Sequence, residues 1–116
     1  MTRTQRSRQL WQLLIGAARL RQTMTYSTAA ELIGMGAGTL SQPLDLIMRY
    51  CHHHSLPPLT VLVVNQETGR PGLGLTTLEE LNQDRERVFN FPWFQRPPLE
   101  SADLDAITSA AATATQ

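Results

Sequence analysis

The sequence predicts a small α+β domain in which helices dominate. Apolar residues recur at helical spacing in two long segments, residues 5–22 and 39–54. Residues 59–65 are rich in Val and Leu, which is typical of a buried strand. The chain of 116 residues is long enough for one hydrophobic core. We therefore expect a single domain over residues 1–107, followed by a low-complexity, disordered tail over residues 108–116.

The first half of the chain reads as three helices. In residues 5–22 the apolar stripe is Leu10, Leu13, Leu14 and Ala17, widened by Trp11 and Ile15. Ser27 or Thr28 is expected to cap a short second helix that ends at Gly34, a residue suited to the left-handed conformation.

The third helix, over residues 39–54, has an apolar and a polar face. Its apolar stripe is Leu40, Leu44, Ile47, Met48 and Cys51, and its polar face is Gln42, Asp45, Arg49, His52 and His53. Pro43 fits only in the first turn, where its missing N–H is not needed.

The second half begins with the predicted strand and a turn. Residues 66–69 read as a turn and residues 71–74 as a tight loop, which together would complete a β-hairpin. Thr77 and Glu80 form a capping-box pattern for a fourth helix through about residue 89. A short helical turn is expected to begin at Ser101.

An aromatic segment follows the fourth helix. All three Phe and one of the two Trp lie within residues 89–94. They either complete the core or, where exposed, supply anchors for a partner or for self-association.

Charge is divided between the two halves of the chain. Residues 1–50 carry six Arg against Glu31 and Asp45, a net +4, whereas residues 51–116 carry four Arg against eight acids, a net −4. A basic half suits nucleic acid, an acidic partner or head-to-tail self-association. A lone Cys51 and the lack of an apolar run of 18 residues predict a cytoplasmic protein without a membrane span.

The order of two motifs resembles the winged-helix DNA-binding domain of alkylguanine–DNA alkyltransferases and alkyltransferase-like proteins. The first is Thr25-Tyr26-Ser27-Thr28-Ala29-Ala30-Glu31-Leu32-Ile33-Gly34, and the second runs from Thr60 through Val63-Val64-Asn65 to Gly74. The resemblance covers about residues 24–74. It implies a winged helix-turn-helix fold for that segment. The periodicity and capping pattern outside it add an N-terminal helix and a C-terminal helix plus aromatic tail.

The resemblance also implies which residues meet DNA. Tyr26 occupies the position of a Tyr that presses the target phosphate, whereas Leu40 occupies that of the Arg finger and Thr60 that of the nucleophilic Cys. A hydroxyl without an adjacent base is a poor nucleophile, so we expect no alkyl transfer. The sequence also lacks a Gly-x-Ser-x-Gly motif, a phosphate-binding loop and paired acids flanking a His, so we expect no other enzymatic activity. We expect a non-catalytic DNA-binding or DNA-associated protein. Its candidate contacts with double-stranded DNA are Thr25, Tyr26, Gln42, Arg49, His53 and Arg70.

One other interpretation stays open. The same scaffold could be a protein-interaction subunit or a homo-oligomer, with Arg6, Arg8, Phe91, Trp93 and Phe94 as partner contacts. The run Cys51-His52-His53-His54 suggests a metal site, but neighbouring helix positions point about 100° apart and cannot enclose one ion. We therefore expect no metal and no cofactor.

Overall fold

The computed structural model describes residues 2–71 and 77–114 and is a small α+β fold, mostly helical. Over these residues the elements in chain order are α1 (Arg3–Arg19), β1 (Met24–Thr25), α2 (Tyr26–Leu32), α3 (Ser41–His53), β2 (Val63–Val64), α4 (Leu78–Asn90) and α5 (Ser101–Ala114). Short 3₁₀ helices, η1 (Ala37–Thr39), η2 (Leu59–Leu62) and η3 (Trp93–Gln95), join them. None of the helices in the described ranges is long and apolar enough to cross a membrane.

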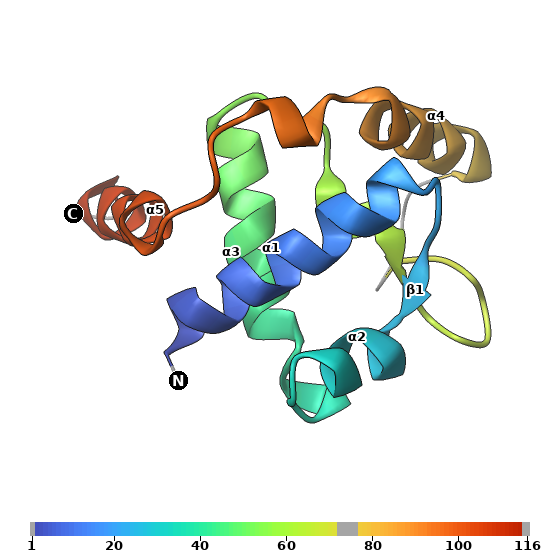
Figure 1. Cartoon of the computed structure of the whole chain (residues 1–116), viewed down its shortest axis with the longest axis horizontal. Helices are drawn as coiled ribbons and strands as arrows, with labels where there is room; N and C mark the ends of the chain where they lie inside the picture. The colour runs from blue at the N-terminus through green and yellow to red at the C-terminus, as the bar shows by residue number, and fades with distance from the viewer. Residues whose placement is uncertain (1, 72–76, 115–116) are drawn as a thin grey trace.

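Helix α1 runs through the middle of the molecule and is the element around which the others pack (Figure 1). It lies against α3, α4, α5, η2 and η3. The predicted stripe is its inward face: Leu10 and Leu14 are fully buried, as are most of Trp11 and Ile15. Thr2 caps the helix. Its hydroxyl oxygen accepts the Gln5 N–H, and the Gln5 side-chain oxygen accepts the Thr2 N–H.

The second helix begins two residues earlier than the sequence predicts. Thr25, rather than Ser27 or Thr28, is the N-cap, and its hydroxyl oxygen accepts the Thr28 N–H at 3.2 Å. Thr25 can serve because β1 holds it in the extended conformation that an N-cap needs. The predicted end is confirmed, since Gly34 adopts a φ of +73° just beyond α2.

The predicted strand is mostly a helical turn. Leu59–Leu62 forms η2, and only Val63–Val64 is extended. Pro57 and Pro58 precede this segment and lack backbone donors, which limits regular strand pairing there. The two-residue strand β2 pairs in parallel with β1, in the register Met24 with Val63 and Thr25 with Val64. The predicted turn over residues 66–69 is confirmed. The predicted loop over residues 71–74 falls mostly on residues 72–74, which lie outside the described ranges.

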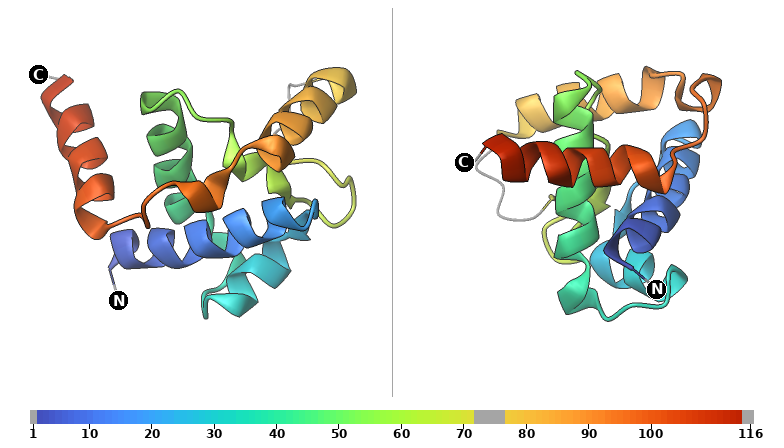
Figure 2. Two further views of the ribbon diagram at one scale, coloured as in Figure 1. Left: turned by 45° about the horizontal axis from the view of Figure 1, so that its top comes forward. Right: turned by 90° about the vertical axis from the view of Figure 1, so that its left-hand side faces the viewer.

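The last third of the chain wraps over α1 and α3. The capping box of Thr77 and Glu80 is confirmed, with bonds of 3.1 and 3.0 Å in its two directions. Helix α5 crosses α3, and its C-terminal end extends past α3 on the side away from α1 (Figure 2). It is a full helix of 14 residues where the sequence analysis expects a short turn, and its helical span reaches Ala114, within the segment 108–116 assigned to a tail.

The aromatic segment divides between core and surface. Trp93 is buried, its Nε1–H donates to the Val88 carbonyl at 2.8 Å, and its ring meets Trp11 edge-on at 5.5 Å. Phe91 is half-buried against Trp93, whereas Phe94 is 61% exposed. Trp93 therefore completes the core, as one prediction for this segment has it, and Phe94 is exposed, as a partner anchor would be.

We expect Trp93→Phe to lower the free energy of unfolding by about 2 kcal/mol, because it removes the indole N–H donor of the Val88 carbonyl, which then keeps the longer bond from the Phe91 N–H at 3.4 Å, and because it opens space beside Trp11. Urea unfolding followed by circular dichroism measures the change. Gln95→Ala, an exposed change two residues away, is the control and should stay within about 0.5 kcal/mol of wild type. Equal stability of the two variants would contradict the structural role of Trp93.

Candidate nucleic-acid interface

The outward face of α3 is free of the core. Helix α3 buries Leu44, Ile47, Tyr50 and Cys51, and Pro43 occupies its first turn as expected. The opposite side forms one continuous strip along the helix, which we call the α3 face. Its residues are Ser41, Gln42, Asp45, Met48, Arg49, His52 and His53. Met48, predicted to lie in the apolar stripe, is instead 50% exposed at the margin of this face.

The charges of the α3 face partly cancel. The Nε of Arg49 lies 3.0 Å from the Asp45 carboxylate one helical turn away, and both side chains are about half exposed. An exposed pair of this kind is weak, generally worth under about 1 kcal/mol, because water and salt screen it. Arg49 therefore remains able to exchange Asp45 for an external anion. Gln42 and His53 extend the row of hydrogen-bonding side chains toward the two ends of the helix.

A second group forms where β1 and β2 pair. The register places Thr25 beside Val64, so the start of α2 adjoins the loop that follows β2. The Thr25 hydroxyl caps α2 and also donates to the Thr28 hydroxyl at 3.0 Å, so it already has partners within the chain. Tyr26, the first residue of α2, is half-buried against the core. The backbone at Tyr26 is therefore held in place by the β1–β2 pair on one side and by α2 on the other.

The loop over residues 65–70 presents Arg70 on a closed backbone. The Asn65 N–H donates to the Arg70 carbonyl at 2.8 Å, and the Gly69 N–H donates to the Asn65 carbonyl at 2.8 Å. Gly69 has a φ of +68°, which other residues adopt at a cost. Arg70 itself is exposed. In Figure 1 this loop lies beside β1, while α3 lies on the other side of the view. The predicted contacts therefore form two groups, one on the α3 face and one around the loop.

Arg85 braces this loop from α4 and was not among the residues singled out from the sequence. Its Nη2 donates to the Gly69 carbonyl at 2.7 Å, and the side chain is half-buried. The signal in the sequence is its position: Arg85 lies between Leu81 and Val88 on the inward side of α4. A cation on an inward helix face indicates a specific acceptor nearby.

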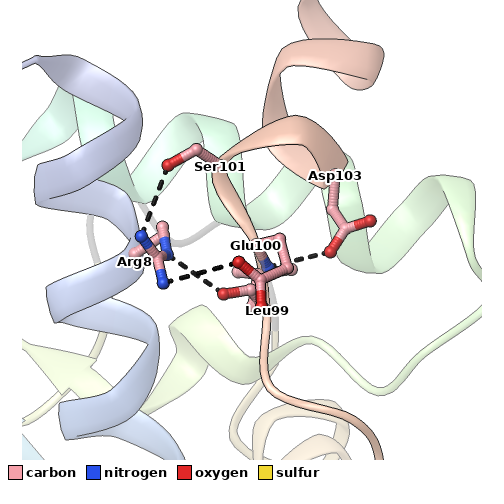
Figure 3. Close-up of polar contacts among 5 residues, drawn as sticks. All are labelled: Arg8, Leu99, Glu100, Ser101 and Asp103. Carbon is pink, nitrogen blue, oxygen red and sulfur yellow. Dashed lines mark hydrogen bonds and ion pairs between the residues drawn. The ribbon is translucent and has the colours of Figure 1, made fainter.

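The residues predicted to bind a protein partner mostly make contacts within the chain. Figure 3 shows Arg8 reaching from α1 to the start of α5, where its Nε donates to the Leu99 carbonyl at 3.0 Å and its Nη1 to the Ser101 hydroxyl at 3.4 Å. Its Nη2 also lies 3.9 Å from the Glu100 carboxylate. Arg6 donates to the Ile33 carbonyl at the end of α2. These two Arg side chains join α1 to its neighbours, whereas Phe94 remains the exposed member of the set.

The run Cys51-His52-His53-His54 lies at the C-terminal end of α3, and its side chains do not point toward a common site. Cys51 is buried, whereas His52, His53 and His54 are exposed. The His54 ring contacts the Tyr50 ring at 4.4 Å and the His53 ring at 5.0 Å. Across residues 2–71 and 77–114, no group of three His, Cys, Asp or Glu side chains is placed to hold a metal ion.

The positions that the resemblance assigns to chemistry are occupied by packing residues. Leu40, at the finger position, is fully buried, and Thr60, at the nucleophile position, is half-buried in η2. Within the part of the chain that the structure describes, the Thr60 hydroxyl makes no side-chain hydrogen bond. Comparisons of the chain with protein-family models, with curated proteins and with solved structures found no match.

We expect Arg85→Met to loosen the loop over residues 65–70. Loss of the donor to Gly69 should raise amide hydrogen-exchange rates of Asn65 and Gly69 about tenfold, equivalent to about 1.4 kcal/mol in the opening free energy. Arg87→Met, an exposed neighbour paired with Asp84, is the matched control and should leave both amides unchanged. Equal exchange in the two variants would show that Arg85 does not brace the loop.

Burial raises the pKa of the Cys51 thiol from 9.0 to about 11, outweighing the lowering effects of the Leu59 backbone and Arg96. The folded protein therefore keeps its thiol proton where the unfolded chain has lost it, and stability should fall as the pH rises from 9 toward 11. Between pH 8 and pH 10, wild type should lose about 1 kcal/mol more than Cys51→Ala in urea unfolding. Parallel pH profiles for the two proteins would contradict this pKa.

Proposed function

We propose that this chain is a non-catalytic DNA-binding protein, built on a winged helix-turn-helix scaffold, that contacts duplex DNA through the α3 face. In this arrangement Gln42, Arg49 and His53 reach base edges or phosphates. Thr25, Tyr26 and Arg70 act on the sugar-phosphate backbone, which fixes orientation without reading sequence.

The observation that carries this proposal is the uncovered polar strip of α3. A helix of 13 residues that buries one side in the core and leaves a row of donors on the other has the form of a helix that can enter a major groove. Residues 33–40, which include Gly34 and η1, connect α2 to α3. A Gly-containing connection between two helices is typical of helix-turn-helix units, and here it is longer than their usual turn of about three to four residues. The resemblance to the alkyltransferase-like domain covers these same elements.

Non-catalytic binding is favoured by the residues at the positions that the resemblance assigns to alkyl transfer. A half-buried Thr60 supplies no thiolate, and a fully buried Leu40 cannot take the place of a flipped base. Affinity is expected to be modest, because Asp45 stands in the middle of the α3 face and the chain has no net charge.

We expect fluorescence anisotropy with a short labelled duplex to give binding that weakens as salt increases, because phosphate contacts release counterions. Arg49→Ala should weaken binding about fivefold and lower the salt slope by about 1. Asp45→Asn should tighten binding about threefold, since it removes a repulsive charge and releases Arg49.

Arg87→Ala is the control for this experiment, because Arg87 is an exposed Arg on α4 with a similar pairing to an acid of its own helix. It should bind like wild type. Absence of binding at about 100 µM protein in low salt would overturn the DNA proposal. Equal losses for Arg49→Ala and Arg87→Ala would remove the α3 face as the site.

A further inference from the structure

The edge formed by α4 and η3 carries an exposed apolar side chain at each end. Helix α4 and the η3 turn follow one another along the upper edge of the view in Figure 1. At the start of α4, Leu78 is 52% exposed, and beyond its end Phe94 is 61% exposed. These are among the few large apolar side chains of the described residues that remain mostly in water. We call the surface from Leu78 to Phe94 the α4 edge.

Phe94 stands on a rigid base between two hollows. Its neighbour Trp93 is fixed by the Val88 carbonyl and by Trp11, so the short η3 turn holds Phe94 outward. On one side lies a hollow of about 310 Å³ beside Phe91, Pro92 and Arg19, and on the other a hollow of about 150 Å³ beside Pro97 and Arg96. A pre-ordered aromatic side chain loses little conformational entropy when it binds, so it suits an interface anchor.

The charge around Phe94 has one sign. Arg19 borders the larger hollow, and its side chain has no hydrogen-bond or ion-pair partner among residues 2–71 and 77–114. Arg96 borders the smaller hollow and donates to the Tyr50 hydroxyl at 3.3 Å. The described residues lining the two hollows include no acid. An occupant that complements this end of the edge therefore combines an apolar side chain with a carboxylate.

The other end of the same edge supplies that combination. Glu79 follows the exposed Leu78 in the first turn of α4, and in the described part of the chain its carboxylate has no ion-pair partner. Glu80 differs, because its carboxylate is used in the capping box. Leu78 and Glu79 are thus the complement of Phe94 and Arg19.

We propose that the α4 edge binds a second copy of this chain, with the two α4 helices antiparallel. Leu78 of each copy enters the larger hollow beside Phe94 of the other, and Glu79 meets Arg19. Helix α4 has 13 residues, about 20 Å, and separates the two ends along one direction. An antiparallel pair therefore makes both contacts at once and closes as a twofold dimer, whereas one contact alone would build open chains.

The residues in the middle of the α4 edge do not oppose close contact between two copies. Glu86 lies midway, and a twofold axis there brings two copies of it near one another. Its carboxylate is already paired with Arg21 at 2.6 Å and accepts from Asn90 at 3.5 Å, so its charge is compensated within each chain. Asn82 and Gln83 on the same exposed side provide neutral hydrogen-bonding groups.

Single-stranded nucleic acid fits this surface less well. Base stacking along a strand needs several exposed rings in succession. Over the described residues Phe94 is the aromatic ring that stands mostly in water at this edge, with Phe89 and Phe91 half-buried and Trp93 buried.

Sedimentation velocity of the wild-type chain from about 1 to 200 µM tests the proposal. The expected result is a reversible, concentration-dependent shift from monomer to dimer. Phe94→Ala should weaken the dimer at least about tenfold, since truncated aromatic anchors cost most at an interface. Leu32→Ala, which removes an equally exposed Leu from α2, is the matched control and should leave the equilibrium unchanged.

A charge exchange tests the pairing of Glu79 with Arg19. Arg19→Glu and Glu79→Arg should each weaken the dimer, and the chain carrying both changes should recover it, because each contact then has its charges swapped. Thermal unfolding of every variant confirms that the fold is retained. A wild-type chain that stays monomeric at 200 µM, or a double variant that fails to recover the dimer, would overturn the proposal. So would Phe94-dependent binding of a labelled single-stranded oligonucleotide by a monomer.

Discussion

The position of Trp11 at the centre of three elements is the constraint on which the rest of the fold depends. Its ring meets Tyr50 of α3 edge-on at 5.4 Å and Trp93 of η3 edge-on at 5.5 Å. Edge-on aromatic pairs bury large areas and fix the relative orientation of the rings. With Leu10 and Leu14 beside it, Trp11 makes α1 the common support for the helix that carries the candidate DNA face and for the turn that carries Phe94. The contacts of Trp11 with Tyr50 and Trp93 therefore hold both the α3 face and Phe94 in fixed positions relative to α1.

The sequence predicts α1, α3 and α4 well because their signals are local. The apolar stripes of α1 and α3, the capping box at Thr77 and Glu80, and the left-handed Gly34 each depend on residues within one or two turns. The strand was predicted too long for the opposite reason. A run of β-branched residues indicates burial, but the length of a strand depends on the partner available, and β1 offers only Met24 and Thr25.

The candidate site divides in the same way. The α3 face follows from helical spacing alone, and Gln42, Asp45, Arg49 and His53 lie where that spacing places them. The uses of Arg8 and Arg85 do not follow, because their acceptors lie 91 and 16 residues away along the chain. Arg6 and Arg8 are predicted as partner contacts, and the structure also uses both within the fold, where their acceptors are backbone carbonyls distant in sequence. The inward position of Arg85 on α4 indicates that it has an acceptor but not which one.

This use of arginine also explains why the charge difference between the two halves is a poor guide to partners. The Arg side chains that have an acceptor or acidic partner among the described residues are Arg6, Arg8, Arg21, Arg49, Arg85, Arg87 and Arg96. Where the acceptor lies far along the chain, as for Arg6, Arg8 and Arg21, a planar guanidinium with several donors suits the contact better than a Lys ammonium would. The Arg side chains without such a partner among the described residues are Arg3 and Arg19, at the two ends of α1, and Arg70, in the loop after β2. Arg49 adds to them where it exchanges Asp45 for an external anion. In the DNA complex that we propose, we expect a small number of phosphate contacts, with shape and hydrogen bonding along α3 supplying much of the affinity.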